Sequence, residues 1–212
     1  RIHMEEDTAK QLHFATFTLL DYNRCGVPLI EIVTKPNIRS GKEAAAYVEQ
    51  LKNILLYLDV SDCKMEEGSL RCDVNISLRP FGQKTFGTKV EIKNLNSTSN
   101  VEKAIDYEIK RQKGLILKNI PIEMETRRFD EATKTTVLMR KKTSAVDYKY
   151  FTEDNIVPIQ LDSLWVEKII SNLPELPHQK SKRYQKEYGL SSYDANILTS
   201  SKEIATYFES TI

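Results

Sequence analysis

The sequence predicts an α+β fold over residues 1–160, followed by the start of an all-helical domain over residues 161–212. Two observations lead to this prediction. In the first part, segments with alternating apolar and polar residues recur, and few of their connections allow the regular strand–helix alternation of a parallel sheet. After Pro158, the apolar residues recur at helical spacing.

The first predicted elements are a strand and a helix. Residues 28–34 are β-branched and apolar apart from Glu31, which is typical of a strand. Ser40 is a predicted N-cap, and Glu43 three residues later completes a capping-box pattern. An apolar stripe of 3.6-residue period follows, made by Ala45, Val48, Leu51, Leu55 and Leu58.

Strand-like alternation and helical spacing of apolar residues predict further elements. Residues 68–78 and 86–93 alternate as strands do, and Asn96 or Ser97 is expected to cap a second helix. Residues 121–129 and 134–141 form a predicted hairpin. In the last part, we expect one helix marked by Trp165, Ile169 and Leu173 and ended by Pro174 and Pro177, and another over 178–188 ended by Gly189.

Composition excludes several classes of protein. The chain has 212 residues and a formal net charge of +1, so it is not a protein that coats a polyanion with a general Lys/Arg excess. The three cysteines form no Cys-x-x-Cys pair, which argues against a disulfide framework and a zinc site and favours a reducing compartment. We expect a cytoplasmic protein, with an organellar location left open. No apolar run approaches the roughly 20 residues of a membrane span.

One face of the segment at 67–77 carries unusual chemistry. Because side chains alternate along a strand, Leu70, Cys72, Val74 and Ile76 share one face. The other face is polar and consists of Glu67, Ser69, Arg71, Asp73, Asn75 and Ser77. An ordinary solvated sheet face is one interpretation. The other is a cradle for a cation and a polyanion, because acids, an arginine and short hydrogen-bonding groups are interleaved.

Carboxylates recur on the polar sides of three such segments. They are Glu5 (or Glu6) near the start of the chain, Glu67 with Asp73, and Glu91 in the segment at 86–93. Like charges crowded on one face repel one another unless a cation binds, and oxygen ligands without cysteine suit Mg²⁺ or Mn²⁺ rather than zinc. A divalent-metal site among Glu5, Glu6, Glu67, Asp73 and Glu91 is therefore predicted.

Basic residues accompany these acids. Arg71, Lys89 and Lys93 lie on the same segments, and Arg127 and Arg140 lie on the predicted hairpin. Their cationic groups are candidates for holding phosphate oxygens in catalysis. Each of them could instead be the ion-pair partner of a neighbouring acid.

Other chemical signals are weaker. His13 and His178 are isolated, the three thiols are expected to be structural, and the lysine-rich stretch at 180–186 is a solvated helix face or a tRNA-backbone contact. With seven glycines, the chain has no phosphate loop and no dinucleotide fingerprint.

Several segments, in order, resemble the B-subunit family of glutamine-dependent aspartyl/glutamyl-tRNA amidotransferases. The resemblance extends over essentially the whole chain. It rests on the strings RIHMEED (1–7), GVPLIEIV (26–33), MEEGSLRCD (65–73), EIKNLNS (91–97), ETR (125–127), DYKYF (147–151), LPELP (173–177) and YDANILT (193–199).

The resemblance implies an antiparallel-sheet cradle related in fold to glutamine synthetase. It also implies a reaction in which ATP phosphorylates the side-chain carboxylate of Glu on tRNA(Gln) or Asp on tRNA(Asn), and ammonia then displaces the phosphate. The ammonia would come from an amidase, the A-subunit of the amidotransferase, and a small C-subunit would complete the complex.

The resemblance also bears on the site residues. The family's metal-binding acids fall in the segments that match Glu5 and Glu6, residues 65–73 and Glu91. With ATP as the implied co-substrate, we expect Ser69, Asn75 and Lys93 to contact the nucleotide. Where the family often has an arginine in Asp-Tyr-Arg-Tyr-Phe, this chain has Lys149, which is a weaker bidentate ligand for an anion.

The sequence leaves two alternatives to this interpretation and one open choice within it. The chain begins and ends as if cut from a longer polypeptide, without the family's N-terminal segment and its tRNA-contacting tail domain. A tRNA-binding scaffold without chemistry is one alternative, although the balanced charge and the acids disfavour it. A glutamine-synthetase-like enzyme that acts on a free amino acid is the other. Within the amidotransferase interpretation, the choice between the Glu and Asp substrates stays open.

Overall fold

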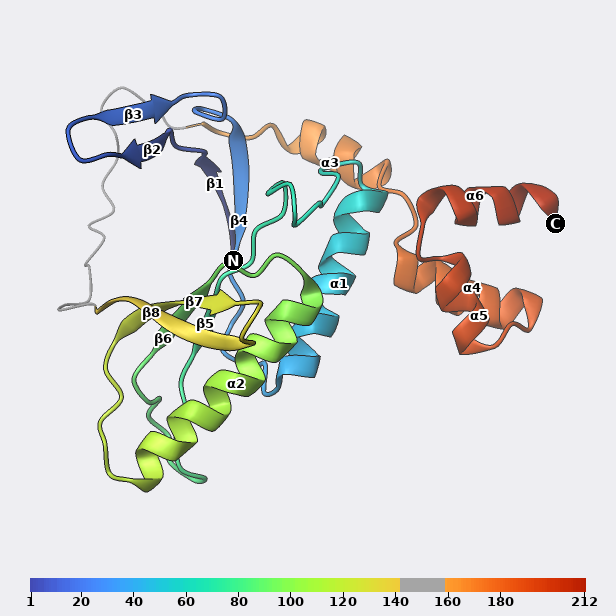
Figure 1. Ribbon diagram of the computed structural model, residues 1–212. Coiled ribbons are helices and arrows are strands. Elements are labelled where there is room, and N and C mark those ends of the chain that lie inside the picture. Colours follow the sequence, from blue (N-terminus) through green and yellow to red (C-terminus); the bar gives the residue numbers. More distant parts are fainter. Residues whose placement is uncertain (142–158) are drawn as a thin grey trace. The chain divides into compact units, whose positions relative to one another are not determined.

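A computed structural model describes residues 1–141 and 159–212 (Figure 1). The chain forms two compact units, residues 1–39 and residues 40–212, and each is considered by itself below. The motif at 147–151, including Lys149, lies outside the described residues.

The first unit consists of two antiparallel strand pairs. Strand β1 (Ile2–Glu6) pairs with β4 (Pro28–Ile32), and β2 (Lys10–His13) pairs with β3 (Thr18–Asp21). The predicted strand at 28–34 is thus confirmed, within two residues of its end. Asp7, directly after β1, is buried and forms an ion pair with Arg24 (Nε–Oδ2 3.0 Å).

The second unit contains a four-stranded sheet in the order β5-β6-β7-β8. Its strands are β5 (Val74–Ile76), β6 (Val90–Lys93), β7 (Glu125–Asp130) and β8 (Thr135–Lys141). The pairs β5–β6 and β7–β8 are antiparallel, but β6 and β7 are parallel. The sheet is therefore mixed, whereas the resemblance implied an antiparallel one. The long helix between β6 and β7 returns the chain to the end from which β6 began, which allows the parallel pairing.

Two helices pack against each other in this unit. Helix α1 (Gly41–Tyr57) begins after Ser40, whose side chain accepts from the Glu43 N–H at 3.1 Å, as the N-cap prediction requires. Helix α2 (Thr98–Leu117) is capped by Ser97, which resolves the choice between Asn96 and Ser97. A Cβ on Gly41 would lie 2.6 Å from the Glu102 carbonyl oxygen, so the absence of a side chain there permits the close approach of the two helices.

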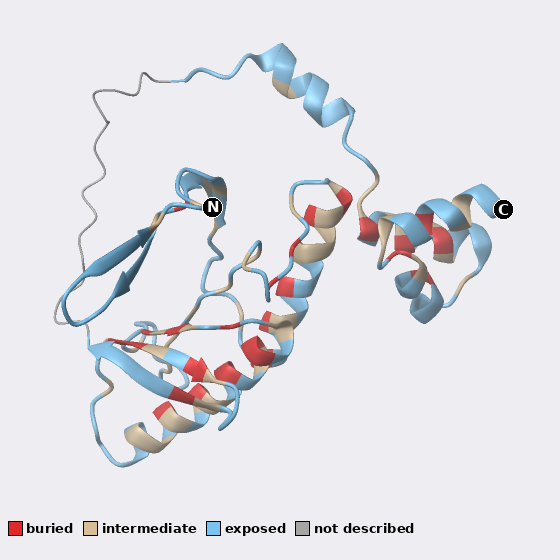
Figure 2. Ribbon diagram, turned by 45° about the horizontal axis from the view of Figure 1, so that its top comes forward, coloured by how far each residue is buried: buried red, intermediate tan, exposed pale blue. Residues whose placement is uncertain are grey.

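Helix α2 covers one face of the sheet and contributes much of the core. Figure 2 shows the buried residues along α1, α2 and the strands beside them. The fully enclosed apolar side chains include Val90, Ile92 and Val101, and Phe129 of β7 is buried with them. Burial of this apolar surface is the main favourable contribution to folding of the unit.

Two predicted strands are shorter than expected. Of residues 68–78, only Val74–Ile76 forms a strand, and of residues 86–93, only Val90–Lys93 does. Residues 65–69 form a turn instead, closed by hydrogen bonds from Gly68 N to Met65 O and from Ser69 N to Lys64 O. Gly68 has φ +77°, and this left-handed conformation bends the chain where a strand would continue. Phe86, in the part of this segment that forms no strand, is exposed and lies under the guanidinium of Arg79.

The described residues after 158 contain four helices. They are α3 (Ser163–Ser171), α4 (Pro177–Tyr188), α5 (Ser192–Leu198) and α6 (Lys202–Thr211). Gly189, at φ +65°, ends α4 as expected, but Pro177 begins that helix rather than ending the preceding one. The predicted domain boundary near residue 160 stays a prediction. Among the described residues, no helix combines the length and apolarity that crossing a bilayer demands.

Candidate functional site

The polar face of the four-stranded sheet collects several predicted site residues. Asn75 of β5 lies opposite Glu91 of β6, which lies opposite Thr126 of β7. Because residues in register share a face, these side chains form one row across three strands. Asp73, just before β5, extends a second row with Lys93. We call the side of the sheet that carries Asp73, Asn75, Glu91, Lys93 and Thr126 the polar face.

Lys93 connects the two acids of the polar face. Its Nζ lies 2.6 Å from Asp73 Oδ2 and 3.7 Å from Glu91 Oε1. Burial alone would lower the pKa of Lys93, but the hydrogen bond to Asp73 and the charges of Asp73 and Glu91 together raise it. Lys93 is therefore a cation at neutral pH, positioned between two carboxylates.

The carboxylates of the polar face differ in accessibility. The Asp73 side chain is 46% exposed, whereas that of Glu91 is 17% exposed and accepts a hydrogen bond from Thr126 Oγ1 at 2.8 Å. Glu91 is thus a partly enclosed and oriented carboxylate. Its oxygens, those of Asp73 and the Asn75 amide are hard donors of the kind that Mg²⁺ prefers, and the Lys93 ammonium already pairs with both carboxylates.

A buried ionic network occupies the opposite face of the sheet, beneath α2. Glu108 of α2 is fully buried, and its carboxylate accepts from Arg111 Nη2 at 2.6 Å and from Thr136 Oγ1 at 3.0 Å. Arg111 and Arg127 both donate to Glu125 Oε1, at 2.8 and 3.0 Å. We call this set the buried network: Glu108, Arg111, Gln112, Glu125, Arg127 and Thr136.

The network is internally neutral and fully hydrogen-bonded. It holds two carboxylates and two guanidinium groups, and Gln112 Nε2 adds a hydrogen bond to Glu108 at 3.0 Å. Burial would lower the pKa of Arg111, but its hydrogen bonds and charge interactions with Glu108 and Glu125 raise it. Among the described side chains, no buried nitrogen or oxygen lacks a hydrogen-bond partner. The charges on this face therefore have a structural role.

The two arginines predicted on the hairpin are separated by the sheet. Arg140 lies opposite Thr126 in register, in the row that contains Glu91. Arg127 lies opposite Ile92, on the α2 side, where Glu125 and Thr136 hold its guanidinium. Arg127 is thus the ion-pair partner of a neighbouring acid, which is one of the two roles that the sequence left open for it.

The turn at 65–69 removes other predicted residues from the sheet. Glu67 forms an ion pair with Lys64 (3.0 Å), and the Ser69 hydroxyl bonds within the same loop, to Asp62 and Lys64. Arg71 donates to the Gly68 carbonyl at 3.3 Å, before β5 begins. Lys89 is exposed and directly precedes β6. The strand-face alignment predicted for Glu67, Ser69 and Arg71 is not formed, because local hydrogen bonds close a turn instead.

In the first unit, alternation separates the two predicted acids of β1. Glu5 shares a face with His3, whose Nε2 lies 2.6 Å from Glu31 Oε2 on the paired strand. Ligand atoms of His3, Glu5 and Glu31 all lie within 4.8 Å of one another. Glu6, the neighbour of Glu5, points to the other side of the strand. The predicted five-carboxylate metal set includes residues of both units, so its assembly stays a prediction.

Sequence reasoning missed three residues beside the site. Thr126 and Arg128 share the polar face, since Arg128 lies opposite Lys93. The apolar Phe129 marks the core face of β7, so its spacing from Thr126 and Arg128 was the available signal. Glu108 lies at helical spacing from Ala104 and Ile105, on the inward stripe, where a buried carboxylate indicates a paired charge.

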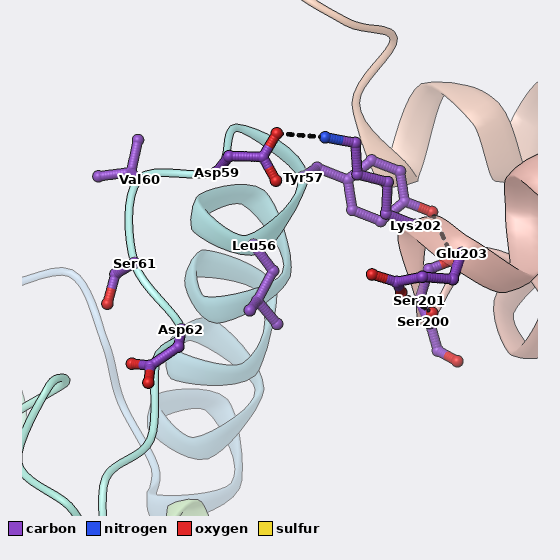
Figure 3. Close-up of a pocket in the computed structure, with 10 residues that line it drawn as sticks. All are labelled: Leu56, Tyr57, Asp59, Val60, Ser61, Asp62, Ser200, Ser201, Lys202 and Glu203. Atoms are coloured by element: carbon purple, nitrogen blue, oxygen red, sulfur yellow. Dashed lines mark hydrogen bonds and ion pairs between the residues drawn. The ribbon is translucent and has the colours of Figure 1, made fainter.

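A cavity of about 410 Å³ lies elsewhere in the second unit, at the end of α1. Figure 3 shows its lining, which comes from residues 56–62 and 200–203. Tyr57 Oη donates to the carbonyls of Thr199 (2.9 Å) and Ser201 (3.3 Å), and Lys202 forms an ion pair with Asp59. None of the predicted site residues lines this cavity. It lies where the end of α1 meets the start of α6, and it is not the candidate site.

Among residues 1–141 and 159–212, no thiol is arranged for nucleophilic catalysis. Cys63 is fully buried, Cys25 is exposed, and burial raises the pKa of Cys72 to about 11. A thiol with that pKa is protonated at neutral pH and is a poor nucleophile. His13 bonds to Thr18 of the adjacent strand (3.0 Å).

Comparison with known proteins identifies relatives of the whole chain. Residues 1–167 match the profile of the GatB/GatE catalytic domain. The chain is 61% identical over 212 residues to the B-subunit of the aspartyl/glutamyl-tRNA(Asn/Gln) amidotransferase of Mycoplasma mycoides, and 55% identical over 213 residues to that of Geobacillus thermodenitrificans. Each alignment covers 100% of this chain, but only 44% and 45% of the respective relative.

The chain thus spans somewhat less than half the length of the curated relatives it matches. The expected resemblance is confirmed over every described element. By its match to the profile over most of its length, the chain belongs to the GatB/GatE catalytic-domain family.

Proposed function

We propose that this chain is the catalytic portion of a tRNA-dependent amidotransferase. In the proposed reaction, ATP phosphorylates the side-chain carboxylate of Glu-tRNA(Gln) or Asp-tRNA(Asn), and ammonia then displaces the phosphate to form the amide. The observation that carries the proposal is the polar face, where Asp73, Glu91 and Lys93 gather oxygen donors and a cation on rigid strands. The names of the relatives support the choice of substrate.

The proposed chemistry needs positive charge near a transferring phosphoryl group. A carboxylate is a poor electrophile, and conversion to an acyl phosphate provides a stable leaving group. Two anions meet in that step, so cationic groups must stabilise the charge that develops. Lys93, Arg128 and Arg140 are the basic residues that the register places on the polar face.

A divalent cation, Mg²⁺ or Mn²⁺, completes the proposal. Asp73 and Glu91, both in the second unit, would hold it. When bound, such an ion supplies charge neutralisation for the phosphates of ATP. Asn75 and Lys93, as neighbours of Glu91, would contact the nucleotide in this proposal.

The proposal assigns ammonia production to another protein. A glutaminase requires an activated nucleophile, such as a cysteine paired with a base. The three thiols offer none in the described structure, and the Cys72 pKa of about 11 excludes a neutral-pH thiolate there. We therefore propose that the ammonia comes from an amidase A-subunit, with a small C-subunit in the same heterotrimer and the misacylated tRNA as substrate.

A tRNA-binding scaffold is the second candidate function. The exposed acids at Glu67 and Asp73 disfavour it, because uncompensated carboxylates repel a phosphate backbone. The balanced net charge of +1 points the same way.

Amidation assays on the full-length protein separate these proposals. With ATP, Mg²⁺, misacylated tRNA and free ammonium, the isolated protein is expected to form the amide. With glutamine in place of ammonium, it is expected to release no glutamate. Binding of tRNA without any ATP-dependent amidation would favour the scaffold, and glutamine turnover abolished by one Cys→Ala change would contradict the need for a partner amidase.

A further inference from the structure

The side chain of Thr126 is buried on the polar face, opposite Glu91. Its residue is 1% exposed, and its Oγ1 donates to Glu91 Oε2 at 2.8 Å. The other carboxylate oxygen, Oε1, faces Lys93 Nζ at 3.7 Å. The hydrogen bond thus directs one oxygen of Glu91 to β7 and turns the other towards Lys93 and Asp73.

Hydrogen bonds on the opposite face of the sheet hold β7, the strand that carries Thr126. The residues on either side, Glu125 and Arg127, point to the opposite face and join the buried network, where the Arg127 guanidinium donates to Glu125 at 3.0 Å and to the Thr136 hydroxyl at 2.8 Å. The pairing with β8 shifts register between Thr126 and Arg127. A bulge of this kind re-aims a side chain, and the network on its buried side leaves it little freedom.

A carboxylate without a local hydrogen bond samples several rotamers, whereas a ligand must keep one orientation for a metal to bind tightly. Residues that orient ligands by hydrogen bonding typically change metal affinity by 10–100-fold when they are replaced. We propose that Thr126 is a positioning residue that holds the Glu91 carboxylate in its ligating orientation, from a strand anchored by the buried network. This inference rests on the proposed function, which assigns Glu91 to the cation.

The variant Thr126→Val tests the inference, because valine keeps the shape and removes the donor. Thr126→Ser keeps the donor, and Thr135→Val is the matched control, since it removes a threonine hydroxyl of β8 that bonds to Thr133 instead. The full-length protein in its amidotransferase complex is titrated with Mn²⁺ alone, and binding is followed by electron paramagnetic resonance. Amidation is then measured against Mg²⁺ concentration.

We expect Thr126→Val to raise the half-saturating Mn²⁺ concentration about 10-fold or more. The Mg²⁺ concentration for half-maximal amidation should rise in parallel. In Thr126→Ser, both values should stay within about threefold of the wild type. Thr135→Val should change neither value. A purely structural role would instead lower the thermal unfolding midpoint of the metal-free protein and leave Mn²⁺ affinity unchanged.

Three outcomes would overturn the inference. Wild-type Mn²⁺ affinity in Thr126→Val removes the positioning role and leaves the proposed function intact. Equal defects in the Ser and Val variants show that the hydroxyl does not act as the donor. No Mn²⁺ binding by the wild-type complex contradicts the metal site itself, and the positioning inference fails with it.

Discussion

The two faces of the four-stranded sheet differ in how far their charged side chains are buried and in how they are paired. On the α2 side, the carboxylates of Glu108 and Glu125 are 0% and 8% exposed and are bonded to arginines. On the polar face, Asp73 is 46% exposed and shares Lys93 with the less exposed Glu91. Residues from the same strands supply both faces, since Glu125 and Arg127 alternate with Thr126 along β7.

The difference shows how to separate structural from functional charge. A charge buried with all its hydrogen bonds made inside the protein is already compensated, and removing its partner leaves an expensive unpaired ion. A charge on a partly open face keeps access to a ligand and contributes little to stability. Both faces carry carboxylates and cationic side chains, so burial and partners distinguish the roles.

The largest expected effect comes from the buried face. Glu108→Gln removes one charge from the network, where Arg111 and Thr136 donate to the carboxylate. We expect a loss of about 3–5 kcal/mol in the free energy of unfolding, the usual cost of breaking a buried ion pair. Urea denaturation of the full-length protein measures it, with exposed Asp106→Asn on the same helix as the control. If Glu108→Gln were as stable as this control, the network would not be needed for the fold.

On the polar face, we expect a substitution to reduce catalysis strongly and stability little. Glu91→Gln keeps the shape of the side chain and removes one charge, so tRNA affinity and the unfolding free energy should change little. Amide formation should fall on the order of 10²–10³-fold, because an interaction made in the transition state is lost. Single-turnover amidation and filter binding of tRNA measure the two quantities. Wild-type amidation by the variant would contradict a catalytic role for Glu91, and a loss of tRNA affinity would favour the scaffold function.

A smaller effect is expected at the cation of the polar face. Lys93→Met removes the ion pair with Asp73, whose partners are 38% and 46% exposed, so stability should change by less than about 1 kcal/mol. The KM for ATP should rise about 10-fold if Lys93 binds phosphate oxygens, since a charge-assisted hydrogen bond would be lost. Steady-state kinetics with varied ATP test this. An unchanged KM would leave Lys93 as an ion-pair partner of the acids.

The smallest expected effect is on the pH dependence of stability, and it comes from Tyr57, a buried neutral side chain. Burial raises the pKa of Tyr57 to about 12, and Glu209 and Glu203 add to the rise. The unfolded chain therefore loses this proton near pH 10, before the folded protein does, and stability should fall between about pH 10 and pH 12. Tyr57→Phe should show a shallower fall in unfolding free energy over that range. Parallel curves for the two proteins would contradict a role for Tyr57 ionisation.

Much of the local structure was predictable from short-range rules. Ser40 and Ser97 cap the two helices because their side chains satisfy backbone N–H groups that the helix leaves unpaired, and these signals are local. The turn between β7 and β8 is equally local, since Asp130 Oδ1 accepts from the Ala132 and Thr133 N–H groups. The strand predicted at 68–78 was too long, because alternation in the sequence continues through a turn where Gly68 adopts positive φ.

The sequence by itself determined which residues alternate, and hence that Asn75, Glu91 and Lys93 share a polar side of their strands. Only the tertiary structure decided which strands are neighbours and in which register. It paired β6 with β7 in parallel, placed Arg127 against buried carboxylates and brought Thr126 to Glu91. The physical reason is range: alternation and capping follow from adjacent backbone geometry, whereas register follows from packing α2 and its buried charges against the whole sheet.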